Sequence, residues 1–236
     1  MAIIENKYRI GVKYVNQNRL LTLRGIILLL EDLACRHSDM VGFGINDTLK
    51  TNLSWVLLNW KIKILKEANY GSTVTVKTWS RDTNKLYTYR DFEIYDENNN
   101  LICIASSKWV LLSTKTGHIT QITDEIRNAY NPENKTVFEE PEISKLIEPS
   151  NANETFSFRV NRRDIDINNH MNNLYYLDYA LEALPEDVYL KKFKNVEITY
   201  KNSSKLGDIV NCFYKEQDVV MKSETSKILY AIIKLC

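Results

Sequence analysis

The first half of the chain shows a helical hydrophobic pattern followed by a series of strand patterns. Leu20 to about Val41 predicts a helix, because apolar side chains recur at helical spacing and Gly42 supplies a stop. A short strand is expected before it, at Tyr8 to Tyr14. Segments rich in Val, Ile, Thr, Tyr and Trp then predict four strands, Trp55–Leu65, Thr73–Ser80, Leu86–Tyr95 and Leu101–Ser113.

Turn-forming residues separate these strands, at Asn69-Tyr70-Gly71, Asp82-Thr83-Asn84 and Asp96 to Asn100. Residues 121–153 lack periodicity and are rich in proline and charge, so we predict a linker there. Within it, Asp124 to Tyr130 predicts a short helix. The predicted domains are therefore residues 1–120 and 154–236.

The pattern then begins again. Phe156 to Arg162 predicts a strand, Asn172 to Leu184 a helix, and the chain from Val196 onward a second set of strands. The turn at Gly71 matches the turn at Gly207 with an offset of 136 residues (207 − 71). Internal duplication is the simplest interpretation. We predict an α+β fold of two tandem hot-dog domains, each a long helix wrapped by an antiparallel sheet.

Composition narrows the functional classes. Hydrophobic residues make up 44% and charged residues 26% of the 236 residues, as in ordinary folded proteins. The 31 basic and 30 acidic residues nearly cancel, so no overall field favours nucleic acid or an anionic membrane. The four cysteines, at 35, 103, 212 and 236, lack metal-ligand spacing. We expect reduced thiols, no metal and no nucleic acid partner.

The chain carries no targeting or membrane signal that we recognise. Met1 to Asn6 has neither a basic segment nor a long apolar run, so no signal peptide is expected. The apolar run Ile26 to Leu30 ends at Glu31 and Asp32, far short of a membrane span. We therefore expect a cytoplasmic protein with no membrane partner.

A cluster of polar residues precedes the second predicted helix. If the segment is extended, alternation places Asp164, Asp166, Asn168 and His170 on one side. Imidazole gains and loses a proton near neutral pH, and a carboxylate can orient it, so these residue types suit acid–base catalysis. Asn and Asp also favour turns and helix caps. The residues alone leave a catalytic site and a merely capped loop about equally supported.

A resemblance to a known family favours the catalytic site over the capped loop. The segment Asp164 to Tyr176, followed by Leu181-Glu182, resembles the signature loop and helix of plant and bacterial acyl-acyl carrier protein thioesterases. Blocks of the first half follow in that family's order, namely Asn52 to Val56, Tyr70-Gly71, Thr78-Trp79, Arg90-Asp91-Phe92 and Ala105 to Val110. The resemblance runs from about Tyr8 to the C-terminus.

This resemblance implies hydrolysis of fatty acyl groups from the phosphopantetheine arm of acyl carrier protein, in fatty acid biosynthesis, without a cofactor. The family's catalytic Asp, Asn and His fall on Asp166, Asn168 and His170. Backbone N–H groups at the start of the Asn172 helix offer an oxyanion site. The first domain is expected to form the acyl tunnel, through helix residues such as Ile27 and Ala34.

One departure from the family stands out. Plant members carry a Glu-Cys pair on the strand after the second helix, where this chain has Ser203-Ser204. A covalent cysteine mechanism is therefore excluded at that position. Ser203 is a possible water-positioning residue, and Ser204 is interpreted as strand filler. The basic residues expected to receive an acidic carrier protein are Arg159, Arg162, Arg163, Lys191, Lys192 and Lys194.

Other functions stay open at this point. The chain could be an acyl-coenzyme A thioesterase or another hot-dog enzyme acting on acyl thioesters. It could also be an acyl-binding protein without activity, although the presence of Asp166, Asn168 and His170 speaks against that loss. Neither the preferred chain length nor the choice between monomer and homodimer is encoded in a motif.

Overall fold

The computed structural model describes residues 2–81 and 84–236, which fall into two compact units. The first ends at Ile143 and the second runs from Ser144 to Cys236. This division lies inside the segment 121–153, and the domain limits 1–120 and 154–236 stay predictions. Asp82 and Thr83, from the predicted turn, lie outside the described residues. No helix of the described residues is both long and apolar enough to cross a membrane.

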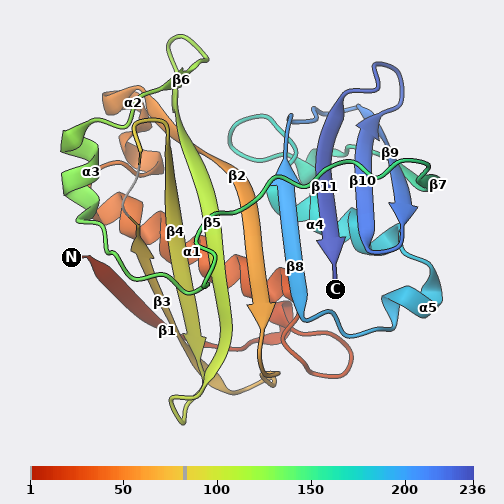
Figure 1. The fold of residues 1–236 in the computed structure, drawn as a ribbon, viewed down its shortest axis with the longest axis horizontal. Helices are drawn as coiled ribbons and strands as arrows, with labels where there is room; N and C mark the ends of the chain where they lie inside the picture. Colours follow the sequence, from red (N-terminus) through yellow and green to blue (C-terminus); the bar gives the residue numbers. More distant parts are fainter. Residues whose placement is uncertain (1, 82–83) are drawn as a thin grey trace. The chain divides into compact units, whose positions relative to one another are not determined.

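The first unit is an antiparallel sheet with a long helix, α1, against one face (Figure 1). Its strands follow the order β1-β3-β4-β5-β2, and β6 pairs with β5. The elements, in chain order, are β1 (Ile3–Arg9), α1 (Leu23–Met40), α2 (Thr48–Thr51), β2 (Leu53–Ile64), β3 (Thr73–Ser80), β4 (Tyr87–Tyr95), β5 (Leu101–Ser113), β6 (Ile119–Thr120) and α3 (Asp124–Tyr130). Short 3-10 turns lie at Val12–Tyr14 and Ile45–Asp47.

Helix α1 forms the core of this unit with the inner face of the sheet. The Thr22 side chain caps it by accepting a hydrogen bond from the Gly25 N–H at 2.9 Å. Its buried side is lined by Ile26, Ile27, Leu29, Leu30, Leu33 and Ala34. From the sheet, Trp60 is fully buried on the same side, so burial of large apolar side chains holds helix and sheet together. Trp79 is also fully buried but lies on the other face of the sheet, where its Nε1–H donates to the carbonyl of Lys135 at 2.9 Å. The first-half tryptophans at these two positions are core residues.

The opening strand differs from its prediction. It spans Ile3–Arg9 rather than Tyr8 to Tyr14, because Ile10 leaves the sheet edge and the chain turns into the 3-10 segment Val12–Tyr14. Rather than bonding to a neighbouring strand, the carbonyl of Tyr14 accepts the N–H of Thr22 at 2.9 Å at the start of α1. The remaining predicted strands and the two predicted helices of this unit, α1 and α3, lie within three residues of their expected limits.

The second unit repeats the same arrangement. Its elements are β7 (Asn153–Arg159), a 3-10 turn (Arg162–Asp164), α4 (Asn173–Glu182), α5 (Glu186–Tyr189), β8 (Asn195–Tyr200), β9 (Ile209–Lys215), β10 (Asp218–Ser223) and β11 (Leu229–Leu235). The strand order β7-β9-β10-β11-β8 repeats that of the first unit strand for strand, and α4 lies against the sheet (Figure 1). The predicted tandem hot-dog fold is confirmed.

The same hydrogen bond occurs at equivalent positions within each unit. The N–H of Gly71 donates to the carbonyl of Ile10 at 2.9 Å, and Gly207 donates to Val160 at 3.0 Å. Both glycines have a positive φ, 88° and 89°, which glycine adopts without strain. The predicted strand Phe156 to Arg162 is corrected to Asn153–Arg159, because the chain turns after Val160 as it does after Ile10.

The segment after α3 is ordered although its sequence has no periodicity. The Lys135 ammonium lies 2.6 Å from Glu93 Oε1 on β4, and the N–H of Val137 donates to Asp91 Oδ2 at 3.0 Å. Burial raises the pKa of Asp91, although the nearby Arg81 opposes that shift. These polar contacts, rather than an apolar pattern, hold the segment against the first unit.

Candidate active site

The predicted catalytic residues lie in one tight turn between the 3-10 segment and α4. Oδ1 of Asp166 accepts the N–H of Asn168 at 2.8 Å and that of His170 at 3.3 Å. The N–H of Asp166 donates to the carbonyl of His170 at 2.8 Å. Asn169 has a φ of 59°, a left-handed conformation that Asn tolerates. The segment is therefore a turn, so the condition of an extended segment, on which the one-sided alternation depended, does not hold.

Asp164 does not belong to this turn's exposed side. It is fully buried, at 0% exposure, and its Oδ2 accepts the N–H of Asn161 at 2.7 Å and the hydroxyl of Tyr179 at 3.1 Å. Its carbonyl accepts the N–H of Asn172 at 2.8 Å. Asp164 thus holds the loop against α4, and the expected convergence of two carboxylates on one side is corrected.

The first unit contains the same turn with different side chains. Oδ1 of Asn16 accepts the N–H of Asn18 at 3.0 Å and that of Leu20 at 3.2 Å. The N–H of Asn16 donates to the carbonyl of Leu20 at 3.0 Å, and Arg19 has a φ of 62°. These positions precede those of the second unit by 150 residues (166 − 16). The turn therefore requires neither a carboxylate nor an imidazole, so its hydrogen bonds do not explain Asp166 or His170.

The side chains of the turn are accessible but do not form a preassembled triad. Asp166 and His170 are half-buried, and Asn168 is exposed. Among the residues that the structure describes, no hydrogen bond joins the side chains of these three, and Oδ2 of Asp166 has no donor. One carboxylate oxygen, an imidazole and an amide are thus left to meet a substrate or water.

Helix α4 begins directly after the turn and presents backbone N–H groups. Oδ1 of Asn172 caps the helix by accepting the N–H of Leu174 at 2.9 Å, and the Asn172 carbonyl accepts the N–H of Tyr175 at 3.0 Å. Within the described chain, the N–H of Asn173 has no such acceptor. The candidate oxyanion donor therefore narrows to the N–H of Asn173, where the helix dipole also favours negative charge.

Ser203 and Ser204 have separate roles, and neither lies in a strand, because β8 ends at Tyr200. Ser203 is exposed. Ser204 is fully buried, its hydroxyl lies 3.0 Å from the Tyr176 hydroxyl, and its carbonyl accepts the N–H of Met171 at 2.9 Å. The interpretation of Ser204 as strand filler is wrong, because its hydrogen bonds join α4 to the end of the turn that carries Asp166 and His170.

Tyr176 was not singled out by the sequence. It stands beside Tyr175 in an aromatic run, and nothing in that run marks which hydroxyl is buried. Its oxygen also accepts the N–H of Ser204 at 2.9 Å. Burial raises the pKa of Tyr176, so the phenol stays protonated near neutral pH and can serve as a donor as well.

We expect Ser204→Ala to lower the free energy of unfolding by about 1 kcal/mol and to retain most of the turnover. Ala68 supports this expectation, because its carbonyl accepts the N–H of Leu21 at 2.9 Å at the equivalent place in the first unit. Ser203→Ala should retain substantial activity and full stability. Urea denaturation and steady-state rates measure both variants. A complete loss of activity in a folded Ser204→Ala protein would give this hydroxyl a chemical role.

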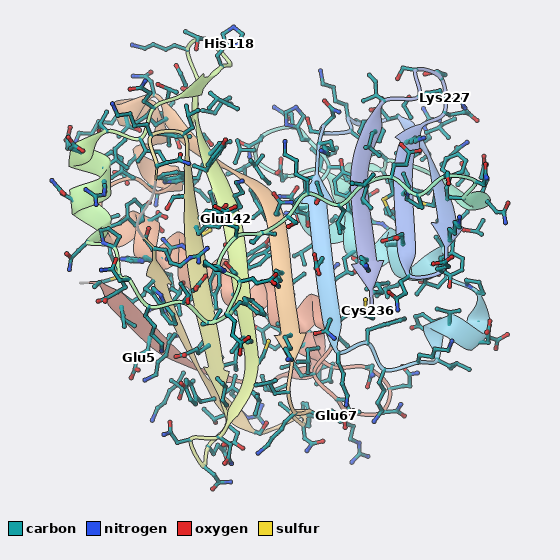
Figure 2. All side chains as sticks on the ribbon, in the orientation of Figure 1. Glu5, Glu67, His118, Glu142, Lys227 and Cys236 are labelled. Carbon is teal, nitrogen blue, oxygen red and sulfur yellow. The ribbon has the colours of Figure 1, made fainter. Side chains whose placement is uncertain are left out.

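The other two histidines lie elsewhere. His37 is buried on α1, and its Nδ1 lies 2.9 Å from Nη1 of Arg90, which can only donate. Nδ1 therefore accepts, and His37 is held neutral. Burial lowers the pKa of Arg90. Figure 2 shows His118 at the tip of the hairpin between β5 and β6. His170 is thus the histidine that adjoins the candidate site.

No group of three or more His, Cys, Asp or Glu side chains in the described part of the chain is placed to hold a metal ion. Cys212, in β9, is buried, and burial raises the pKa of its thiol to about 12. A buried thiol of this kind is protonated at neutral pH. Cys212 lies in β9, beyond the turn that follows Ser203 and Ser204, and so does not stand at the position of the plant family's cysteine.

Comparisons with known proteins give matches in both halves of the chain. Residues 2–130 match the family model for the acyl-ACP thioesterase N-terminal domain, and residues 147–234 match the model for the C-terminal domain. The chain is 30% identical over 226 residues to oleoyl-acyl carrier protein thioesterase 2, chloroplastic, of Arabidopsis thaliana. The matched region covers 88% of this chain and 60% of that relative. The chain therefore spans less than two thirds of that curated relative.

Solved structures show the same fold. An acyl-ACP thioesterase from Bacteroides thetaiotaomicron superposes with a TM-score of 0.86 at 24% identity, covering 99% of this chain and 96% of the other. A 12:0-ACP thioesterase from Umbellularia californica gives a TM-score of 0.85 at 20% identity, with 99% and 97% covered. At these identities the likeness concerns the fold.

Proposed function

Because the chain belongs to the acyl-ACP thioesterase family, we propose that it hydrolyses fatty acyl-acyl carrier protein thioesters to free fatty acid and carrier protein. One observation supports this proposal most directly. The two units share one turn, yet the second carries Asp166 and His170 where the first carries Asn16 and Leu20. The second unit therefore carries acid–base side chains on a turn that the first unit forms without them.

The proposed reaction begins with water as the nucleophile. His170 takes a proton from water, the water oxygen bonds to the thioester carbonyl carbon, and the carbonyl oxygen becomes an oxyanion. The N–H of Asn173 stabilises that charge. When the carbon–sulfur bond breaks, the imidazolium returns its proton to the sulfur. Asp166 stabilises the imidazolium through its charge, and Asn168 positions the thioester or the water.

Direct attack by water fits the two serines better than an acyl-enzyme does. The Ser204 hydroxyl is buried and already bonded to Tyr176, and the exposed Ser203 has no described base beside it. Ser203 remains a candidate for positioning a water molecule. The proposal therefore includes no covalent intermediate.

The acyl chain and the carrier protein complete the proposal. We place the acyl tunnel in the first unit, along α1, where Ile27, Leu30 and Ala34 form part of the buried face. Acyl carrier protein is the partner, no separate cofactor takes part, and the protein acts as a monomer or homodimer. We assign the reaction to the cytoplasm, although the plant relative is described as chloroplastic.

Product analysis tests the proposal. The purified protein is incubated with a ladder of acyl-acyl carrier proteins and the matching acyl-coenzyme A thioesters, and products are identified by mass spectrometry. We expect free fatty acid and free thiol, with faster release from carrier protein. Faster release from coenzyme A would favour the acyl-coenzyme A alternative, and an enoyl product would indicate a dehydratase. A tight acyl complex without turnover would leave only acyl binding.

A further inference from the structure

A basic hollow lies beside the catalytic turn of the second unit. Its volume is about 800 Å³, and its lining joins the end of β7 and the following 3-10 segment to the turn before β9. The lining residues are Arg159, Val160, Asn161, Arg162, Arg163, Leu206 and Gly207. The hollow contains three arginines and no acidic side chain in its lining, so it suits an anion.

Two of these arginines lack a partner that would neutralise them. Within the described residues, no carboxylate forms an ion pair with Arg159 or Arg162, and both are exposed. Arg163 is exposed as well, and its Nε lies 3.5 Å from Oδ1 of the buried Asp164. The nearby Asp208 is already engaged, because its Oδ2 accepts the N–H of Lys205 at 2.8 Å. The hollow therefore keeps a net positive charge.

The first unit shows that the fold does not demand this charge. At the position equivalent to Arg162 it carries Val12, which is 76% exposed. Its Arg9, equivalent to Arg159, lies over the ring of Tyr70 at 5.5 Å, and Tyr70 stands where the second unit has Leu206. The second unit thus carries three basic side chains where the first carries two, Arg9 and Lys13, and its Arg159 has Leu206 rather than an aromatic ring at the position of Tyr70.

Three of the six basic residues expected to receive carrier protein line this hollow, and the three lysines do not. Lys191, Lys192 and Lys194 precede β8, whereas Leu206 and Gly207 follow its other end. A six-residue strand spans roughly 20 Å, so these lysines and the arginine hollow lie apart. The three lysines therefore do not line the hollow, and the expectation that all six basic residues receive carrier protein stays a prediction.

We propose that this hollow binds the phosphate group of the phosphopantetheine arm while the arm's thioester reaches the catalytic turn. The inference rests on the proposed thioesterase function. Planar guanidinium groups bind phosphate oxygens in pairs, a geometry that the unpaired Arg159 and Arg162 can provide. Arg162 and Asp166 are separated by four residues, at most ~14 Å of chain, which a pantetheine arm can span. The same phosphate chemistry occurs on carrier protein and in coenzyme A.

Substitutions that copy the first unit test this site. Arg162→Val introduces the side chain found at Val12, and Arg159→Ala removes the second unpaired charge. For each variant, kcat/KM is measured on acyl-carrier protein, on acyl-coenzyme A and on the phosphate-free acyl-N-acetylcysteamine thioester. We expect the ratio of phosphate-bearing to phosphate-free kcat/KM to fall about tenfold, as loss of a charge-assisted hydrogen bond predicts. Lys13→Ala, in the first unit, is the matched control and should leave that ratio unchanged.

Calorimetry with 4′-phosphopantetheine and pantetheine provides a readout that needs no turnover. The phosphorylated probe should bind the wild-type protein more tightly, and Arg162→Val should remove the difference. Equal binding of the two probes would overturn the proposal. A loss confined to acyl-carrier protein would also overturn it, because the arginines would then contact the carrier's acidic side chains. If wild-type protein hydrolyses no thioester, the proposed function fails, and the calorimetric difference still decides whether the hollow binds phosphate.

Discussion

Replacement of His170 by leucine should lower the turnover rate roughly a hundredfold or more, the scale of a general acid–base group. The free energy of unfolding should hardly change. Leu20 occupies the same position of the same turn in the first unit, and its N–H donates to Asn16 as that of His170 donates to Asp166. His170→Leu therefore removes the imidazole while supplying a side chain that this turn already accommodates.

The measurements are steady-state rates on an acyl-carrier protein substrate and chemical denaturation of the same samples. His170→Ala should lose a similar factor in rate, which separates loss of the imidazole from any effect of leucine's size. Near wild-type turnover in a stable His170→Leu protein would remove the histidine from the mechanism. The turn itself would then be the functional element.

Asp166 requires two substitutions, because its two carboxylate oxygens have different roles. Oδ1 holds the turn through the N–H groups of Asn168 and His170, whereas Oδ2 has no donor within the described chain. Asp166→Asn keeps an oxygen acceptor, as Asn16 shows in the first unit. It should retain stability and lose activity roughly a hundredfold. Asp166→Ala should lose that activity and, in addition, about 1 kcal/mol of stability.

The comparison between these two variants is the decisive result. If Asp166→Asn keeps wild-type turnover while Asp166→Ala loses it, Asp166 acts only by shaping the turn, and its charge has no catalytic role. If both lose activity but only Asp166→Ala loses stability, the free oxygen acts on the reaction. Denaturation midpoints and kcat values for both proteins distinguish these outcomes.

Local pattern was sufficient for most of the fold. The strands Thr73–Ser80 and Leu101–Ser113 have their predicted limits, because residue types that favour strands fill them and turn-forming residues lie beyond their ends. The duplication was visible because the Gly71 and Gly207 turns need a positive φ, which restricts the residue type. The limits of the opening strands were missed, since a 3-10 turn such as Val12–Tyr14 has no distinct periodicity.

For the candidate site, residue type suggested a chemistry, and tertiary structure determined the geometry. The sequence alone placed an acid, an amide and a histidine between a strand and a helix, because those residue types are rare together outside sites and caps. It could not show that Asp164 is buried beneath the loop or that Ser204 bonds to Tyr176. Such facts depend on contacts between segments distant in sequence. The arginine hollow could not be predicted from the sequence either, because only the pairing of β7 with β9 brings Arg159 and Gly207 together.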